Sequence, residues 1–185
     1  MIGITGQIGA GKSFVGRILR EGGFSVVDAD QAVHLLYRDD QKLRLAVAKE
    51  FGEGALTEEG VNRKFFADLI FRDASARIRL ENLVYPVLTS YIIQTNPAYV
   101  EAALFENVPD LVELLDEIWV VTAPAELRLQ RLVTNRGFSP EDARLRMDLQ
   151  QSKNSEECWR TLFPGKKLRF IENIGDEVSL RKVLP

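Results

Sequence analysis

The residues from Gly6 to Ser13 have the spacing Gly-x-x-x-x-Gly-Lys-Ser, which predicts a phosphate-binding loop. Glycines let successive backbone N–H groups turn towards phosphate oxygens. Lys12 supplies a positive charge for the β- and γ-phosphates, and the Ser13 hydroxyl is the expected ligand of the magnesium ion that accompanies ATP. The chemistry expected here is therefore the binding of ATP together with Mg2+.

The neighbouring residues fit this interpretation. An apolar segment of strand type, with Ile2 and Ile4, runs directly into the loop, and apolar residues at helical spacing follow it from Phe14 to Leu19. The positive end of that helix would add to the attraction for phosphate. A chance glycine-rich turn would not require both flanking elements, so the context favours the loop.

Two acids follow the next apolar segment, residues 25–28. In an open α/β sheet, ligands bind outside the carboxyl ends of the strands, which places Asp28 and Asp30 on the same rim as the loop. Asp30 is also a candidate N-cap of the following helix, and the two roles are compatible. His34 should share the face of Asp30 one turn later, either as a functional residue or as an ordinary surface or packing residue.

Residues 38–97 show helical patterns throughout, without convincing strand alternation. Pro86 should kink or divide the third of these helices. Arg63 and Lys64 begin the second helix, where they could form either a solvated face or an anion contact.

Strand character returns at residues 99–106, 117–122 and 168–172, with a short helix at 108–115. Strands that alternate with helical crossovers indicate a parallel sheet. Glu101 and Glu106 lie near either end of the first of these segments. Glu106 is the preferred site residue because it lies at the carboxyl end.

Arginines gather after the helix start at Pro124. The leucines of this helix should face inward and Arg128 and Arg131 elsewhere, and Arg136 follows, with more arginines up to residue 151. Guanidinium groups on a short helical excursion could clamp phosphates and neutralise charge in a transition state. Solvated helix faces with i,i+4 pairs are the alternative for many of them.

The composition is that of an ordinary globular protein. The length of 185 residues allows one domain with an inserted subdomain. A net charge of −3 argues against a general nucleic-acid binder. The single cysteine, Cys158, excludes an internal disulfide and fits a reducing compartment. Since we recognise neither a membrane-spanning run nor a leader peptide, we expect a cytoplasmic protein without membrane partners.

Over nearly its whole length the chain resembles the dephospho-CoA kinase family, within the P-loop nucleoside and nucleotide kinase fold. The motifs that carry the resemblance are Ile2–Ser13, Asp28–His34, Asn62–Phe71, the proline of the third helix, Leu104–Asn107, Leu129–Arg131, Gln150 and Ile171–Gly175.

The resemblance implies an α/β, three-layer fold with a five-stranded parallel sheet. It implies a nucleotide-binding core of residues 1–37, 98–130 and 166–185, a helical CoA-binding insertion of residues 38–97, and a lid of residues 131–165. The implied reaction transfers the γ-phosphate of ATP to the ribose 3′-hydroxyl of dephospho-CoA, in a monomer or small homo-oligomer.

The resemblance also implies roles for single residues. Asp30 would accept the hydroxyl proton, and Lys12, Arg131 and Thr5 would complete the catalytic set. The implied ATP contacts are Gly6, Gly9, Ala10, Gly11, Lys12, Ser13, Phe14 and Asn173, with Ser13 as the magnesium ligand. The implied substrate contacts are Asp30, His34, Arg63, Tyr85 and Glu106.

Two departures from the family pattern concern the site. The family usually has His where this chain has Tyr85, and Arg where it has Asn135, with Arg136 one step later. The alternatives are another small-molecule P-loop kinase, acting on a nucleoside or nucleotide, and a non-catalytic ATP-binding regulatory module. A GTPase is disfavoured because no guanine-reading Asn-Lys-x-Asp is found.

Overall fold

A computed structural model describes residues 1–150 and 153–185, which form two compact units. Residues 1–27 and 97–185 form the first unit, and residues 28–96 form the second. The second unit begins earlier than the expected insertion because helix α2 (Ala29–Asp39) packs on α5 (Ala74–Thr95). Residues 151 and 152, which belong to the expected lid, lie outside the described residues.

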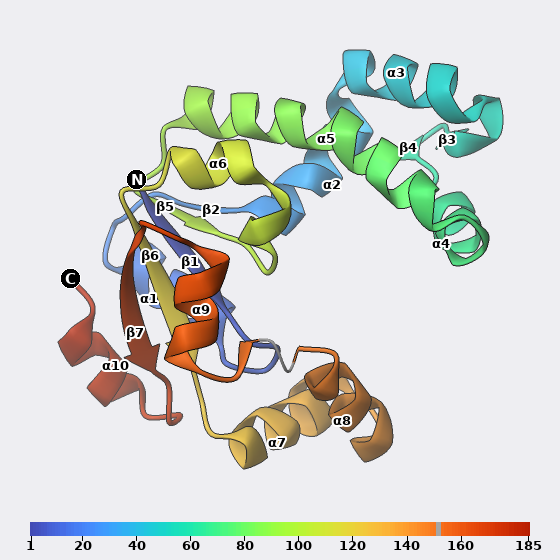
Figure 1. The fold of residues 1–185 in the computed structure, drawn as a ribbon. Helices are drawn as coiled ribbons and strands as arrows, with labels where there is room; N and C mark the ends of the chain where they lie inside the picture. Colours follow the sequence, from blue (N-terminus) through green and yellow to red (C-terminus); the bar gives the residue numbers. More distant parts are fainter. Residues whose placement is uncertain (151–152) are drawn as a thin grey trace. The chain divides into compact units, whose positions relative to one another are not determined.

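The first unit is built on a five-stranded sheet in the order β2-β5-β1-β6-β7 (Figure 1). The central strand β1 pairs in parallel with β5 and β6, and β6 pairs in parallel with β7. The strands are β1 (Ile2–Gly6), β2 (Val26–Asp28), β5 (Tyr99–Glu101), β6 (Glu117–Thr122) and β7 (Lys167–Glu172). The expected α/β fold with a parallel five-stranded sheet is thereby confirmed.

The strand expected over residues 99–106 was too long. Strand β5 ends at Glu101, and residues Phe105–Asn107 form the 3-10 turn η2. The chain turns because Phe105 is buried completely beneath the sheet, next to Leu115 and Gly3. Glu106 therefore lies in a turn and does not end a strand.

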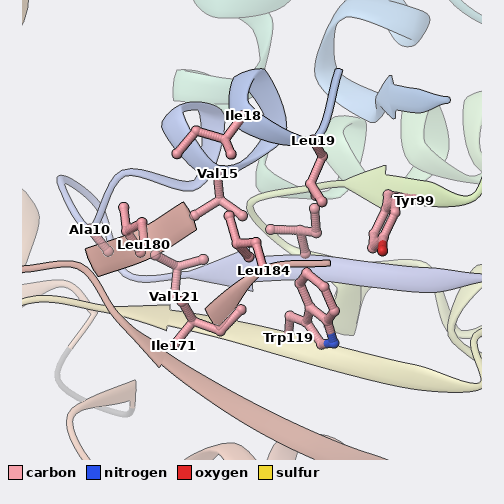
Figure 2. Close-up of a cluster of buried hydrophobic side chains, with 11 residues drawn as sticks. Ala10, Val15, Ile18, Leu19, Tyr99, Trp119, Val121, Ile171, Leu180 and Leu184 are labelled. Atoms are coloured by element: carbon pink, nitrogen blue, oxygen red, sulfur yellow. The ribbon is translucent and has the colours of Figure 1, made fainter. Parts of the chain in front are cut away.

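One apolar cluster holds the first unit together (Figure 2). Helix α1 (Lys12–Glu21) contributes Val15 and Leu19, and α10 (Glu177–Val183) contributes Leu180. These side chains pack against inward-facing residues of the strands, among them Val121 and Ile171. Burial of this apolar surface fixes the start of α1 against the end of β1, which is where the phosphate loop lies.

Four further helices belong to the first unit: α6 (Pro109–Glu113), α7 (Ala125–Arg136), α8 (Pro140–Asp148) and α9 (Glu156–Leu162). Ser139 caps α8 as its position before Pro140 predicts. The inward face expected for α7 was wrong in part: Leu132 is buried as expected, but Arg128, one turn before it, is buried as well. The leucines at 127 and 129 are only partly buried.

The second unit contains α2, α3 (Gln41–Phe51), η1 (Glu53–Ala55), α4 (Arg63–Arg72) and α5. It also holds a small antiparallel pair, β3 (Leu56–Thr57) and β4 (Gly60–Val61), where helices alone were expected. Gly60 permits this pair because its φ is 134° and a Cβ there would lie 2.4 Å from the carbonyl oxygen of Tyr37.

Two local expectations for this unit also need correction. Asp28, not Asp30, is the N-cap of α2, accepting a hydrogen bond of 3.0 Å from the N–H of Gln31. Helix α5 continues through Pro86 as one helix, so the proline does not divide it. Among the helices that the structure describes, none is long and apolar enough to cross a bilayer.

Candidate functional site

The phosphate loop curls around the side chain of Lys12, whose Nζ donates a hydrogen bond of 3.0 Å to the carbonyl oxygen of Gly6. Gly11, the N-cap of α1, has a φ of 94°. A Cβ on Gly11 would lie 2.2 Å from Nδ2 of Asn173, so a side chain has no room there. Glycine is therefore required at this position of the motif, because Asn173 approaches closely and the backbone is left-handed.

Ser13 donates a hydrogen bond of 2.6 Å from its hydroxyl to Oε1 of Glu101. Glu101 ends β5, the neighbour of β1, and is buried. In P-loop enzymes a hydroxyl of the loop and an acid on a neighbouring strand hold the magnesium ion. Glu101, and not the Glu106 that the sequence favours as a site residue, therefore lies at the carboxyl end of β5 beside the loop. The signal that identifies it is its place directly after the apolar residues of the strand.

Glu106 lies in η2, where its Oε1 is 2.5 Å from Nζ of Lys153. Lys153 is buried and also lies over the ring of Trp159, 5.3 Å from its centre. Lys153 could not be found from the sequence, since a lone lysine in a segment without a recognised pattern gives no signal. The expected role of Glu106 in substrate binding has no support from these contacts.

Arg131 and Asn173 contact the loop from the segments that follow β6 and β7, at the same carboxyl end of the parallel sheet. Nη1 of Arg131 donates to the carbonyl oxygens of Gly9 and Ala10 at 3.3 and 3.2 Å, and Nη2 donates to Oδ1 of Asn173 at 3.0 Å. Nδ2 of Asn173, directly after β7, donates to Ala10 at 2.8 Å. Burial lowers the pKa of the Arg131 guanidinium. Both residues therefore support the backbone of the loop.

These residues surround a cavity of about 320 Å³. The loop lines it from Gly11 to Phe14, and Arg131 and Arg136 line it from α7. Ala10, a residue of the loop itself, is fully buried. Thr5 is also fully buried, and its hydroxyl has no hydrogen-bond partner among the described residues. The wall of the cavity has the amides and positive charges that a nucleotide phosphate needs.

The segment that leads from α8 to α9 also contacts the loop. Oε1 of Gln150 accepts a hydrogen bond of 2.8 Å from the N–H of Ile8. Nε2 of Gln7 donates to Oδ1 of Asn154, also at 2.8 Å. Gln150 and Asn154, which lie outside the loop motif, therefore help to hold the loop in place.

The second unit has a cavity of about 500 Å³ between α2, α4 and α5. Asp30, His34, Arg63 and Tyr85, four of the five expected substrate contacts, all line it. Tyr37 lines it as well, and burial raises the pKa of its hydroxyl to about 12. Arg77 and Glu81 line it too, together with four aliphatic side chains: Val33, Ile70, Leu80 and Val84. This mixture of charged, aromatic and aliphatic groups suits a ligand with an anionic part and a less polar arm.

A neighbouring cavity of about 590 Å³ in the second unit shares His34, Tyr37 and Arg63 with the first. It continues along the β3–β4 pair to Asn62, whose side chain caps α4 by accepting from the N–H of Phe65. Arg63 therefore stands at the start of α4 with an open space on either side. This position favours an anion contact over a solvated face for Arg63.

Comparisons with known proteins point to one family. The family model for dephospho-CoA kinase matches residues 1–161. The dephospho-CoA kinase of Staphylococcus aureus is 31% identical over all of this chain and 89% of its own length. A crystal structure from Thermus thermophilus has a TM-score of 0.74 and 28% identity, covering 98% of this chain and 92% of its own.

The dephospho-CoA kinase of Campylobacter jejuni has the same fold, with a TM-score of 0.64 and 24% identity, covering 98% of this chain and 91% of its own. A family model that matches most of the chain and a relative that spans all of it make the same assignment. The chain belongs to the dephospho-CoA kinase family.

Proposed function

We propose that this protein transfers the γ-phosphate of ATP to the ribose 3′-hydroxyl of dephospho-CoA, the last step of coenzyme A biosynthesis. The observation that carries the proposal is the cavity of the second unit, which gathers Asp30, His34, Arg63 and Tyr85 in a chain of this family. The first unit supplies the complementary part, a phosphate loop beside a cavity of about 320 Å³.

The residues at the loop fit ATP with magnesium. Mg2+ prefers oxygen ligands and is usually held by one or two carboxylates together with the phosphates of the substrate. The hydroxyl of Ser13 and the carboxylate of Glu101 are such oxygens, and they already lie 2.6 Å apart. When bound, the ion would neutralise negative charge on the phosphates.

The chain's own residues divide the remaining work. The carboxylate of Asp30 would accept the proton of the acceptor hydroxyl, which makes its oxygen a better nucleophile. Lys12 and the loop amides would hold the β- and γ-phosphates, and Arg131 would keep Gly9 and Ala10 in place as well as adding positive charge. Phosphoryl transfer depends mainly on such positioning and charge neutralisation.

The substrate side would follow the walls of the cavity in the second unit. Arg63 would pair with a phosphate of dephospho-CoA, and the aliphatic wall would take its less polar arm. Tyr85 would stand in for the His that the family usually has. This proposal includes the division into core, insertion (38–97) and lid (131–165). It also includes a cytoplasmic location, no nucleic-acid partner, and a monomeric or small oligomeric state.

The test is an assay of ATP-dependent phosphorylation with the purified protein. We expect 3′-phosphorylation of dephospho-CoA and no transfer to nucleoside monophosphates. The reverse pattern would assign the chain to the other small-molecule P-loop kinases. ATP binding without transfer to any acceptor would instead identify a regulatory module.

A further inference from the structure

Arg128 is a buried charge that the proposed reaction does not yet use. Its side chain is 6% exposed, and two of its nitrogens, Nε and Nη1, are buried without a hydrogen-bond partner among the described residues. Burial also lowers the pKa of its guanidinium, although it remains charged at neutral pH. A guanidinium has five N–H donors in a planar fork, so this one has unused capacity for an anion.

Arg131, one turn later on the same helix, shows how unusual this is. The guanidinium of Arg131 donates to Gly9, Ala10 and Asn173. Arg128 has the same chemistry and greater burial but no comparable partner. A charge that is removed from water without a partner lowers the stability of a fold, so ordinary packing does not explain a buried arginine here.

The position of Arg128 places it against the phosphate loop. A Cβ on Gly9 would lie 3.1 Å from the Cβ of Arg128 and 2.8 Å from its carbonyl oxygen, so α7 touches the loop at this residue. Leu132, one turn along the same buried face, lines the cavity of the loop together with Gly9. The contact of Arg128 with Gly9 makes an anion bound at the loop the candidate partner for its guanidinium.

We propose that Arg128 is a phosphate-binding residue, whose buried guanidinium receives phosphate oxygens of the nucleotide held by the loop. This inference rests on the proposed function only in that the loop binds ATP; it does not depend on the acceptor. It also explains why the fold tolerates the unpaired charge, since bound phosphate would satisfy it.

The experiment compares the wild-type chain with Arg128→Met, which keeps the apolar part of the side chain and removes the charge. ATP and inorganic tripolyphosphate are titrated calorimetrically, without dephospho-CoA, and thermal unfolding of the unliganded proteins is recorded. We expect Arg128→Met to lose about tenfold or more in affinity for both ligands. At the same time its unliganded Tm should rise by a few degrees, because an unpaired buried charge is removed.

Arg72→Gln is the control, since Arg72 is exposed at the end of α4, and neither quantity should change. An unchanged affinity for ATP, whatever the Tm, would show that Arg128 is structural and would overturn the proposal. If Arg128→Met does not fold, Arg128→Lys decides: weaker ATP binding at the wild-type Tm supports the proposal, and unchanged binding contradicts it. Because no acceptor is present, a wrong acceptor assignment leaves all these results unaffected.

Discussion

Ser13 and Glu101 are 88 positions apart in the chain, and the hydroxyl of one donates a hydrogen bond of 2.6 Å to the carboxylate of the other. This bond links the first turn of α1, which follows the phosphate loop, to the carboxyl end of β5, which pairs with β1. It identifies the acid of the first unit that is best placed to assist a metal ion at Ser13.

Replacing Glu101 by Gln should therefore change the metal requirement. The amide oxygen can still accept from Ser13, but the negative charge is lost, so we expect about 10- to 100-fold weaker activation by Mg2+. The measurement is the Mg2+ concentration that gives half-maximal activity. Glu106→Gln is the comparison: it should alter stability but leave this concentration unchanged. An identical Mg2+ dependence in wild type and Glu101→Gln would exclude a role of Glu101 in holding Mg2+.

Replacing Asp30 by Asn tests the base. The asparagine side chain has nearly the same shape but cannot accept the proton, so kcat should fall by about 10²- to 10⁴-fold. Calorimetric titration with ATP should give nearly the wild-type affinity. A parallel loss of ATP binding and transfer would mean that Asp30 has a different role.

The ion pair of Lys153 with Glu106 should act mainly on stability. Lys153→Met leaves the partly buried Glu106 carboxylate without its charge partner, and the free energy of unfolding should fall by about 1–3 kcal/mol. The double variant with Glu106→Leu removes both charges and should recover most of that loss, as urea unfolding would show. If both variants unfold like the wild type, the pair contributes nothing to stability.

Gly11→Ala should disrupt nucleotide binding. The new Cβ would lie 2.2 Å from Nδ2 of Asn173, and the alanine would have to adopt a φ of 94°. Gly52→Ala is a matched control, because its φ is 84° but no atom lies within 4 Å of the added Cβ. Both variants should lose about 1–2 kcal/mol of stability from backbone strain. Only Gly11→Ala should also weaken ATP binding, and equal affinities in the two would contradict the proposed role of this contact.

Features set by neighbours in the chain could be predicted from the sequence. The loop from Gly6 to Ser13, the strand at 117–122 and the cap of α8 by Ser139 all depend on residues within a few positions of one another. In these segments the hydrophobic period, the glycine spacing and the capping residue point to one local structure. The grouping of Asp30 with His34 on one helix follows for the same reason.

Features that depend on distant segments could not be predicted in this way. The choice of Glu101 over Glu106 follows from where β5 ends, which the burial of Phe105 decides. Tyr37 faces the same cavity as Arg63 and Tyr85 only because three helices meet there.

The burial of Arg128 shows most clearly the difference between features set by neighbours in the chain and features set by distant segments. By its type alone an arginine belongs on the surface, and only the packing of α7 against Gly9 places this one inside. The sequence by itself determined the phosphate loop and the elements around it, since these arise from local backbone preferences. Tertiary structure decided which charges surround the loop, because burial and pairing depend on segments that meet only in the folded chain.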